Sequence, residues 1–460
     1  MHKSARFRSF LCSVVVLFGL IEFLHGRVQY LTYIGGIFAL LAFLVILPVT
    51  VIYTRIIASV LCLSGLAALF FSGTFTPGAF IEGFIEMTPL VAILAAVSLL
   101  SIPLKLGNYA DLFHVFYSRT KHPYQIYLVS MIISYVLALL ATLGSIAPSY
   151  YLVKENLNKM GLERSSRFDT TCIIRGFAMA MLVSPAASIV GVALQYTGLS
   201  WLELIGPVFM LSLTGLAAAF FVEPSWRSKR SLQSFNLSSV EEKLIAGVSP
   251  GRYIPFVIIF IVIIASIFFL GNVLHFSSLN SISVACLLSV FAWGIYCGRL
   301  QEVFQHSAIF FKQDIVGISD QIILFLSAGF FTHSMESSGW LLLIGDIIDG
   351  VTGKIGTAAV LCLVPVVILF LAFLGLHPIA SCIIIGKTIC ISAQYISPLG
   401  LAAALLSGGV MTYMVSPFSA TVLLLSTISG NTPYRMGMSW NLGFVAIFWG
   451  IAAVFIGVVA

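Results

Sequence analysis

Two apolar segments of the sequence each contain a Ser-Pro pair, and the pairs lie 232 positions apart. Proline removes a backbone donor and clashes with the preceding helical turn, so each pair predicts an interrupted membrane helix. The half-helix after such a break presents amide donors and partial positive charge, which favour an anion. The residues that repeat at this spacing are Gly176, Met179, Val183, Ser184 and Pro185, matched by Gly408, Met411, Val415, Ser416 and Pro417. The repetition predicts two equivalent breaks at a substrate site, with a pair of packed kinks as the alternative.

The side chains placed at this predicted site are mostly hydroxyls and turn prolines. At the breaks they are Ser184, Pro185, Ser188, Ser416, Pro417, Ser419 and Thr421; at two further turns they are Ser145, Pro148, Ser149, His377, Pro378 and Ser381, and Lys387 follows. No catalytic residue and no metal ligand is predicted from side chains. Backbone carbonyls near Gly144 and Val183 are unassigned candidates for a sodium ion.

Three ionisable residues near these turns each allow two interpretations. Lys387 either offsets the charge of an anionic substrate or extends toward the outer interface. His377 is either a proton carrier, since histidine titrates near neutral pH, or a structural turn residue. Arg175 is interpreted as a positive anchor near the cytoplasmic surface, with substrate contact as the alternative. The segments 176–195 and 398–430 contain no acidic residue, which favours an anion over a cation bound by carboxylates.

The composition restricts the class of protein. Of 460 residues, 60% are hydrophobic and 9% are charged, which excludes a soluble globular domain. Apolar runs of roughly 20 residues recur throughout, and each is long enough to cross a bilayer as a helix. Eight cysteines without a Cys-x-x-Cys pair predict neither a disulfide framework nor a metal site. The net charge of +6 is attributed to basic loops on one side of a membrane, and nucleic acid is not expected as a partner.

We therefore predict an all-α polytopic membrane protein with about 11 transmembrane helices plus two re-entrant hairpins. The predicted spans are 10–24, 30–53, 56–72, 87–104, 170–195, 201–222, 254–274, 280–298, 317–335, 398–430 and 440–459. The charged limb around Lys154 should not face lipid, so 124–162 is predicted as a hairpin with its tip at 144–149. The segment 356–394 is predicted as a second hairpin, with two short spans as the alternative.

The order of these elements predicts a duplicated chain. A first transmembrane helix, 1–29, precedes repeat 1 (30–222, with hairpin 124–162 and broken helix 170–195). A cytoplasmic linker, 223–253, leads to repeat 2 (254–460, with hairpin 356–394 and broken helix 398–430). Lysine and arginine then gather on one side, so the N-terminus is expected in the cytoplasm and the C-terminus outside. Glu82 and Glu86 fall in an outer loop, and the two repeats have inverted topology.

This layout resembles the ion transporter superfamily, and within it the divalent anion:sodium symporters. The Ser-Asn-Thr signatures of the symporters are replaced here by Ser145-Ile-Ala-Pro-Ser149 and His377-Pro-Ile-Ala-Ser381. The resemblance implies a homodimer that works by an elevator mechanism, in which hairpins and broken helices move against a scaffold. Coupling to sodium or protons is also taken from this class.

The sequence thus favours a secondary active transporter of a small, carboxylate-like organic anion, and no enzyme or cofactor is expected. Its expected location is a bilayer such as the bacterial inner membrane. A cation/proton antiporter of the same superfamily is one alternative. A membrane glycan polymerase is another, disfavoured because the predicted external loops are short and poor in charge.

Overall fold

The computed structural model describes residues 3–25, 29–107, 116–117, 120, 122–159, 166–223, 254–276, 278–373, 376–392 and 396–460. The first half contains α1 (Lys3–His25), α2 (Gln29–Ile46), η1 (Leu47–Val49), α3 (Ile52–Phe71), α4 (Pro77–Ile85), α5 (Thr88–Leu99), α6 (Ser101–Gly107), α8 (Pro123–Ala141), η2 (Thr142–Ser145), α9 (Ile146–Lys159), α10 (Ser166–Met181), α11 (Ser188–Thr197) and α12 (Trp201–Val222). The second half contains α14 (Ile254–Asn272), α15 (Ser278–Tyr296), α16 (Leu300–Lys312), η6 (Asp314–Ile318), α17 (Ser319–Ser337), α18 (Trp340–Ile355), α19 (Thr357–Phe373), α20 (Pro378–Ser392), α21 (Pro398–Val415), α22 (Ala420–Ser429), η7 (Arg435–Ser439) and α23 (Trp440–Val459).

The described part of the chain is helical and contains no strand. Nine of its helical segments are long and apolar enough to cross a membrane, and three shorter apolar helices accompany them. The predicted all-α polytopic membrane fold is confirmed. The predicted linker at 223–253, except Glu223, lies outside the described residues.

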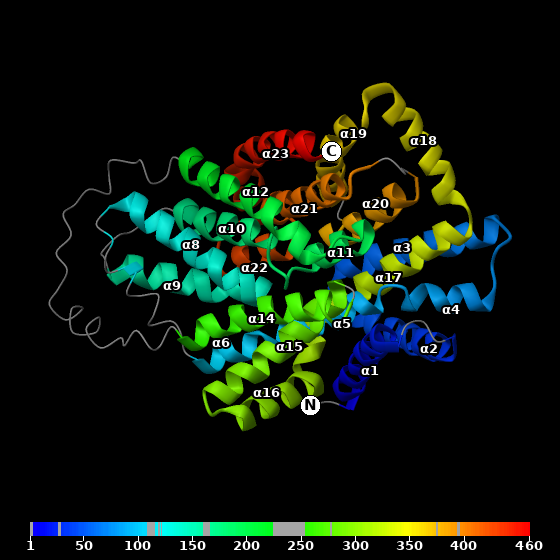
Figure 1. Cartoon of the computed structure of the whole chain (residues 1–460), viewed down its shortest axis with the longest axis horizontal. Helices are drawn as coiled ribbons and strands as arrows, with labels where there is room; N and C mark the ends of the chain where they lie inside the picture. The colour runs from blue at the N-terminus through cyan, green and yellow to red at the C-terminus, as the bar shows by residue number, and fades with distance from the viewer. Residues whose placement is uncertain are drawn as a thin grey trace.

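The helices differ sharply in how much protein surrounds them. In an apolar 18-residue stretch of Pro398–Ser429, the segment that contains α21 and α22, 94% of the residues are buried, whereas the corresponding stretches of Trp201–Val222 and Arg435–Val459 are each only 28% buried. In Figure 1, α21 runs through the middle of the molecule, while α8, α9, α10 and α12 gather at one end and α3, α4, α17 and α18 at the other. A broken helix in this central place is protected from lipid by neighbouring helices.

The predicted hairpin at 124–162 corresponds to two helices, α8 and α9, which lie side by side (Figure 1). The chain turns at Thr142–Ser145 rather than at the predicted 144–149, and Thr142 has a positive φ of 43°. Pro148 instead lies in the first turn of α9, where its missing N–H leaves no helical bond unmade.

The second predicted hairpin corresponds to α19 and α20, which also contact each other. Residues 374–375, between these two helices in the sequence, lie outside the described residues. The division into two inverted repeats stays a prediction.

Candidate functional site at two helix breaks

Both Ser-Pro pairs interrupt a helix where the sequence predicts. Helix α10 ends at Met181 and α11 begins at Ser188, so the first break contains Ser184 and Pro185. Helix α21 ends at Val415 and α22 begins at Ala420, so the second contains Ser416 and Pro417. The backbone of Ser416 is extended, with φ −65° and ψ 122°.

The two serines of the breaks make equivalent hydrogen bonds. The Ser184 hydroxyl donates to the carbonyl oxygen of Leu139 on α8 at 2.7 Å and accepts from the N–H of Ala186 at 3.1 Å. The Ser416 hydroxyl donates to the carbonyl oxygen of Ala372 on α19 at 3.1 Å and accepts from the N–H of Phe418 at 3.3 Å. Each serine therefore ties its break to the first helix of the neighbouring pair, as the interpretation of packed kinks requires.

Two repeated glycines allow the same helices to approach closely. A Cβ atom at Gly176 would collide with the carbonyl oxygen of Met131 on α8, and one at Gly408 would collide with Ile368 on α19. Glycine is needed at both places because only a hydrogen atom fits against the neighbouring helix. The pairing of α8 with α10 thus matches the pairing of α19 with α21.

The interrupted helices also meet across the two halves. Helix α11 contacts α20 and α21, and α22 contacts α9 and α10. The rings of Phe177 and Tyr413 lie 5.9 Å apart, edge to face. A Cβ atom at Gly409 would lie 3.3 Å from the Ile189 side chain and 3.6 Å from the sulfur of Cys382, so α11, α20 and α21 converge there.

Three hydroxyls of the predicted site are buried without a partner among the described residues. They belong to Ser149, Ser381 and Thr421. Ser149 and Ser381 each occupy the fourth position of a helix, α9 and α20 respectively, and are themselves 232 positions apart. A buried polar group without a partner is rare in native proteins, so each of these hydroxyls calls for a ligand or water.

The remaining hydroxyls and the histidine make local contacts. Ser145 donates to the carbonyl oxygen of Thr142, and Ser419 caps α22 by accepting from the N–H of Val422. The imidazole Nδ1 of His377 accepts from the N–H of Ile379 at 3.3 Å, in agreement with a turn residue at the start of α20.

For four other predicted site positions, Ser188 and three prolines, no side-chain hydrogen bond is found among the described residues. Ser188 opens α11, whose N-terminus has no side-chain cap. Pro185 and Pro417 are half-buried within the breaks, and Pro378 begins α20.

The two backbone carbonyl groups suggested as sodium ligands, near Gly144 and Val183, differ in their surroundings. The carbonyl oxygen of Val183 accepts from the indole N–H of Trp201 at 3.3 Å, and Gly144 is exposed. A sodium site at these carbonyl oxygens stays a prediction.

Lys387 is paired with carboxylates and is almost fully buried. Its Nζ lies 3.2 Å from Oε1 of Glu86 and 2.7 Å from Oε2 of Glu336, and its side chain is 8% exposed. It therefore presents no uncompensated positive charge, and one of its two partners, Glu336, is 52% exposed. Glu86, expected in an outer loop, follows helix α4 as its C-cap, and Glu82 lies within α4.

Arg175 is also paired, and its interpretation as a surface anchor is wrong. The side chain is 1% exposed, and its Nη2 lies 2.9 Å from Oε2 of the buried Glu223. Its Nε donates to Asn441 Oδ1 at 2.9 Å, and its guanidinium lies over the ring of Phe444. These contacts join α10 to the end of α12 and to α23.

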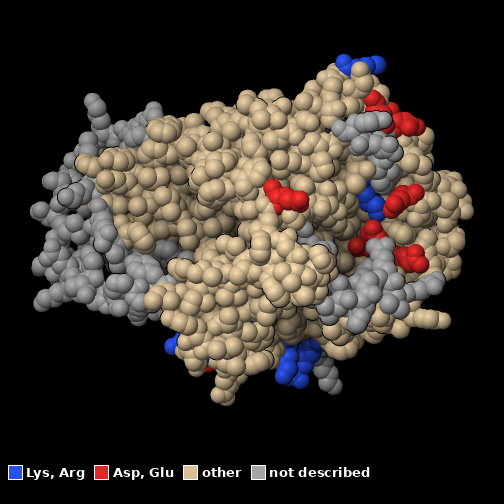
Figure 2. Space-filling view, in the orientation of Figure 1, with Lys and Arg blue, Asp and Glu red and all other residues tan. Residues whose placement is uncertain are grey.

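Sequence reasoning missed the carboxylate partners because they come from distant segments. Glu86 and Lys387 are separated by 301 positions. The one available signal was Lys387 itself, because an ionisable residue at membrane depth requires a partner. Figure 2 shows acidic groups near a basic group at the end of the molecule where α4, α17 and α18 lie.

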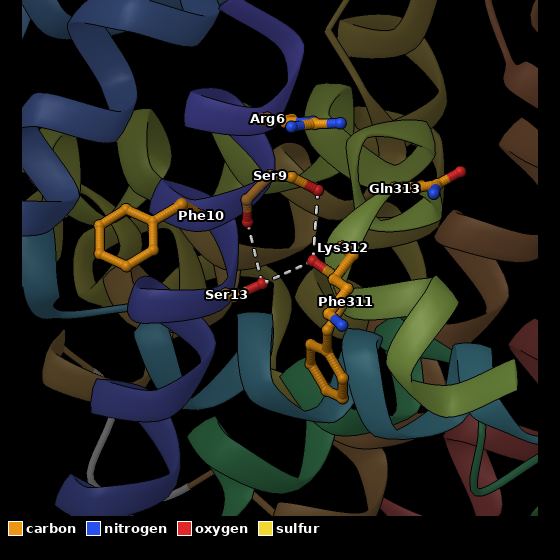
Figure 3. A pocket seen from close by; sticks show the side chains of 7 residues that line it. All are labelled: Arg6, Ser9, Phe10, Ser13, Phe311, Lys312 and Gln313. Atoms are coloured by element: carbon orange, nitrogen blue, oxygen red, sulfur yellow. Dashed lines mark hydrogen bonds between the residues drawn. The ribbon is translucent and has the colours of Figure 1, made fainter. Parts of the chain in front are cut away.

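A separate pocket of about 680 Å³ lies between α1 and the end of α16 (Figure 3). Its lining comprises Arg6, Ser9, Phe10, Ser13, Phe311, Lys312 and Gln313. The hydroxyls of Ser9 and Ser13 both donate to the carbonyl oxygen of Phe311, at 3.2 and 3.0 Å. The pocket shares no residue with the helix breaks, and its two serine hydroxyls are already engaged.

Comparison with solved structures places this architecture beside a known fold. The chain is similar to the Alcanivorax borkumensis YdaH transporter, whose crystal structure has an unusual topology. The TM-score is 0.61 at 14% sequence identity, over 87% of this chain and 97% of that chain. No family model and no curated protein sequence matches the chain. The similarity therefore establishes the fold, while the resemblance to divalent anion:sodium symporters stays a prediction.

Proposed function

We propose that the chain is a secondary active transporter of a small, carboxylate-like anion. The observation that carries this proposal is the pair of helix breaks, which are tied to matching neighbours and enclosed within the protein. Matched discontinuous helices near the middle of a membrane protein are typical of substrate sites in secondary transporters. The fold shared with the YdaH transporter is consistent with this class.

The anion would bind among the unpartnered hydroxyls at the helix starts. Ser149, Ser381 and Thr421 each lie in the first turn of their helix and can donate one hydrogen bond. Because α11 lacks a side-chain cap, its first N–H groups are further donors for a carboxylate. This arrangement needs no free cation, which agrees with the paired states of Lys387 and Arg175.

Movement would follow the elevator scheme, with the broken helices and the pairs α8–α9 and α19–α20 as the moving unit. Ser184 and Ser416 would keep each break attached to its helix pair during that movement. A homodimer, cytoplasmic N-terminus and external C-terminus are part of the same proposal. Coupling would be to an inward ion gradient, either sodium or protons.

The test begins with a thermal-shift screen of mono-, di- and tricarboxylates, followed by uptake of the stabilising radiolabelled anion into proteoliposomes. Ser149→Ala, Ser381→Ala and Thr421→Val should each lower uptake by about tenfold, the equivalent of one lost hydrogen bond of roughly 1.4 kcal/mol. The matched control is Thr214→Val, since Thr214 is exposed on α12. Wild-type uptake in all three variants would remove the assignment of the site.

A cation/proton antiporter is the second candidate, and one observation favours it. Glu86 and Glu336 meet at Lys387, so carboxylates are present that the broken segments themselves lack. Such a protein would collapse a preset pH gradient on addition of sodium or lithium, without any organic anion. A symporter would leave the gradient intact under those conditions.

A further inference from the structure

The second helix break packs against a π-helical turn. This turn, η7, precedes α23 and contacts both α21 and α10. Its buried Gly437 lies so close to Val415, the last residue of α21, that a Cβ atom would collide with the Val415 carbonyl oxygen. Only glycine allows this approach. Because π-helical turns are rare and frequently occur at functional sites, the contact directly before Ser416 and Pro417 calls for an explanation.

Two buried side chains hold this turn in place. Asn441 is 1% exposed and donates from Nδ2 to the carbonyl oxygen of Met436, the neighbour of Gly437, at 2.8 Å. Its Oδ1 accepts from Nε of Arg175 on α10 at 2.9 Å. Arg175 also donates from Nη2 to the carbonyl oxygen of Trp440, the first residue of α23, at 3.1 Å. An arginine of the first broken helix is therefore connected to the second break through Asn441 and η7.

The guanidinium of Arg175 is itself fixed from the other side. Its Nη2 lies 2.9 Å from Oε2 of Glu223, and its Nη1 donates to the carbonyl oxygen of Ala219 on α12 at 3.2 Å. A planar guanidinium presents its donors in a rigid fork, so it cannot move toward or away from Asn441 without losing several of these bonds.

The first break is held by a different contact at the equivalent position. Val183 lies 232 positions before Val415, and its carbonyl oxygen accepts from the indole N–H of Trp201 at 3.3 Å. Trp201 opens α12, as η7 leads into α23. The counterpart of Arg175 is Ser407, whose hydroxyl makes no hydrogen bond in the part of the chain that the structure describes. The connection from one broken helix to the opposite break is therefore a feature of Arg175 and not of Ser407.

We infer that Arg175 and Asn441 are positioning residues for the second helix break, which they hold by pressing η7 against Val415. The first broken helix thereby fixes the shape of the second break, and the two breaks are kept in register across the two halves of the chain. The relevance of this register to anion binding rests on the proposed function, whereas the positioning itself does not.

The test measures hydrogen–deuterium exchange by mass spectrometry on the purified protein in detergent, with no anion present. The two breaks offer matched amides: Ser416 and Ser419 donate to the carbonyl oxygens of Thr412 and Ser416, while Ser184 and Ala187 donate to those of Ala180 and Ser184. Exchange of such amides reports local opening of the backbone.

Asn441→Asp keeps an acceptor for Arg175 but removes the donor to Met436. Exchange in peptides that contain Ser416 and Ser419 should become about tenfold faster, the effect of one lost hydrogen bond, while peptides of the first break stay unchanged. Gly437→Ala should give the same pattern, because its Cβ atom displaces the Val415 carbonyl group.

The role of Arg175 is checked in the double variant Arg175→Met/Glu223→Gln, from which both charges of the buried pair are removed. It should also accelerate exchange at the second break only. Trp201→Phe is the reciprocal variant, since it removes the indole donor to Val183 and should accelerate exchange at the first break only.

Two further variants serve as matched controls with unchanged exchange at both breaks. Asn431→Asp makes the same chemical change at an asparagine whose amide bonds to Ser429. Gly443→Ala adds a methyl group on α23 where a Cβ atom meets no other atom within 4 Å.

Two results would overturn the inference, given intact folding in thermal melting. One is wild-type exchange at the second break in Asn441→Asp and Gly437→Ala. The other is equal acceleration at both breaks, which would show a general loss of stability. Because no anion is present, failure of the anion-uptake experiment would leave this outcome unaffected.

Discussion

The molecule contains two units, each made of a broken helix and its neighbouring helix pair. The first unit is α10–α11 with α8–α9, and the second is α21–α22 with α19–α20. The two units share their serine contacts to the backbone but differ in their charges. In the first unit Ser184 bonds to Leu139, and in the second Ser416 bonds to Ala372. Arg175 in the first unit, however, is replaced by Ser407 in the second. Arg175 is paired with Glu223, while the Ser407 hydroxyl has no partner among the described residues.

The lysines of the two units differ in the same way. Lys154 on α9 is exposed and its Nζ lies 3.5 Å from the Tyr150 hydroxyl, whereas Lys387 on α20 is buried between carboxylates. The shared contacts are those that a helix break requires. The individual charges join each unit to different surroundings: α12 and α23 for the first, α4 and α17 for the second.

The largest expected effect comes from removing the charge that distinguishes the first unit. Arg175→Met removes the buried cationic partner of Glu223, which is itself fully buried, and leaves the partly exposed Arg167 bonded to it. Removing one member of a buried ion pair costs about 3–5 kcal/mol, so the melting temperature in detergent should fall steeply. Ser407→Ala should have little effect on stability, since its hydroxyl is unpartnered.

A second substitution checks the mechanism of that loss. Arg175→Met combined with Glu223→Gln should recover part of the stability, because both charges of the buried pair are then removed. Arg435→Met is the matched control, since Arg435 is exposed over the ring of Trp440. Equal melting temperatures for Arg175→Met and Arg435→Met would contradict the assigned role of Arg175.

Alanine substitution of the repeated glycines, Gly176 and Gly408, should lower the stability of the protein in both cases but by different amounts. Alanine at either position overpacks the helix contact, which costs about 1–3 kcal/mol. Gly176→Ala should be worse than Gly408→Ala, because its Cβ meets a backbone carbonyl of Met131 rather than mainly the Ile368 side chain. Thermal melting of the two variants measures the difference. If Gly408→Ala melted at the lower temperature, the helix contact at Gly408 would tolerate a Cβ atom less well than the contact at Gly176, contrary to this prediction.

Alanine substitution of the serines in the two breaks, Ser184 and Ser416, should lower the melting temperature by similar amounts. Ser184→Ala and Ser416→Ala each remove one hydrogen bond to a neighbouring helix and one from the break backbone, a loss of about 1 kcal/mol. Similar shifts in melting temperature would support the equivalence of the two breaks. A shift in only one variant would restrict this role to one unit.

The smallest expected effect concerns the exposed lysine of the first unit. Lys154→Met should change the free energy of unfolding by less than about 0.5 kcal/mol, as is usual for a surface position. Comparison with Lys387→Met, which leaves Glu86 and Glu336 without their shared ammonium partner, shows whether the burial of Lys387 accounts for the difference. Equal melting temperatures of these two variants would argue against the ion pairs of Lys387.

Local chemistry made several features predictable. The Ser-Pro pairs specify both helix breaks, because the effect of proline is confined to its own helical turn. The turn before α9 was misplaced by a few residues, since Pro148 is tolerated within the first turn of the helix. The role of Arg175 was misread, because its sequence neighbours do not reveal that Glu223 is beside it.

The sequence by itself determined that the chain is an all-helical membrane protein with two interrupted helices, since apolar length and proline geometry act locally. Only the tertiary structure decided that the Ser184 hydroxyl is engaged while that of Ser149 finds no partner in the part of the chain that the structure describes. It also decided that Lys387 is neutralised by Glu86, 301 positions away, and by Glu336. In a low-dielectric interior every charge and hydroxyl depends on its immediate neighbours, and packing chooses those neighbours from distant parts of the chain.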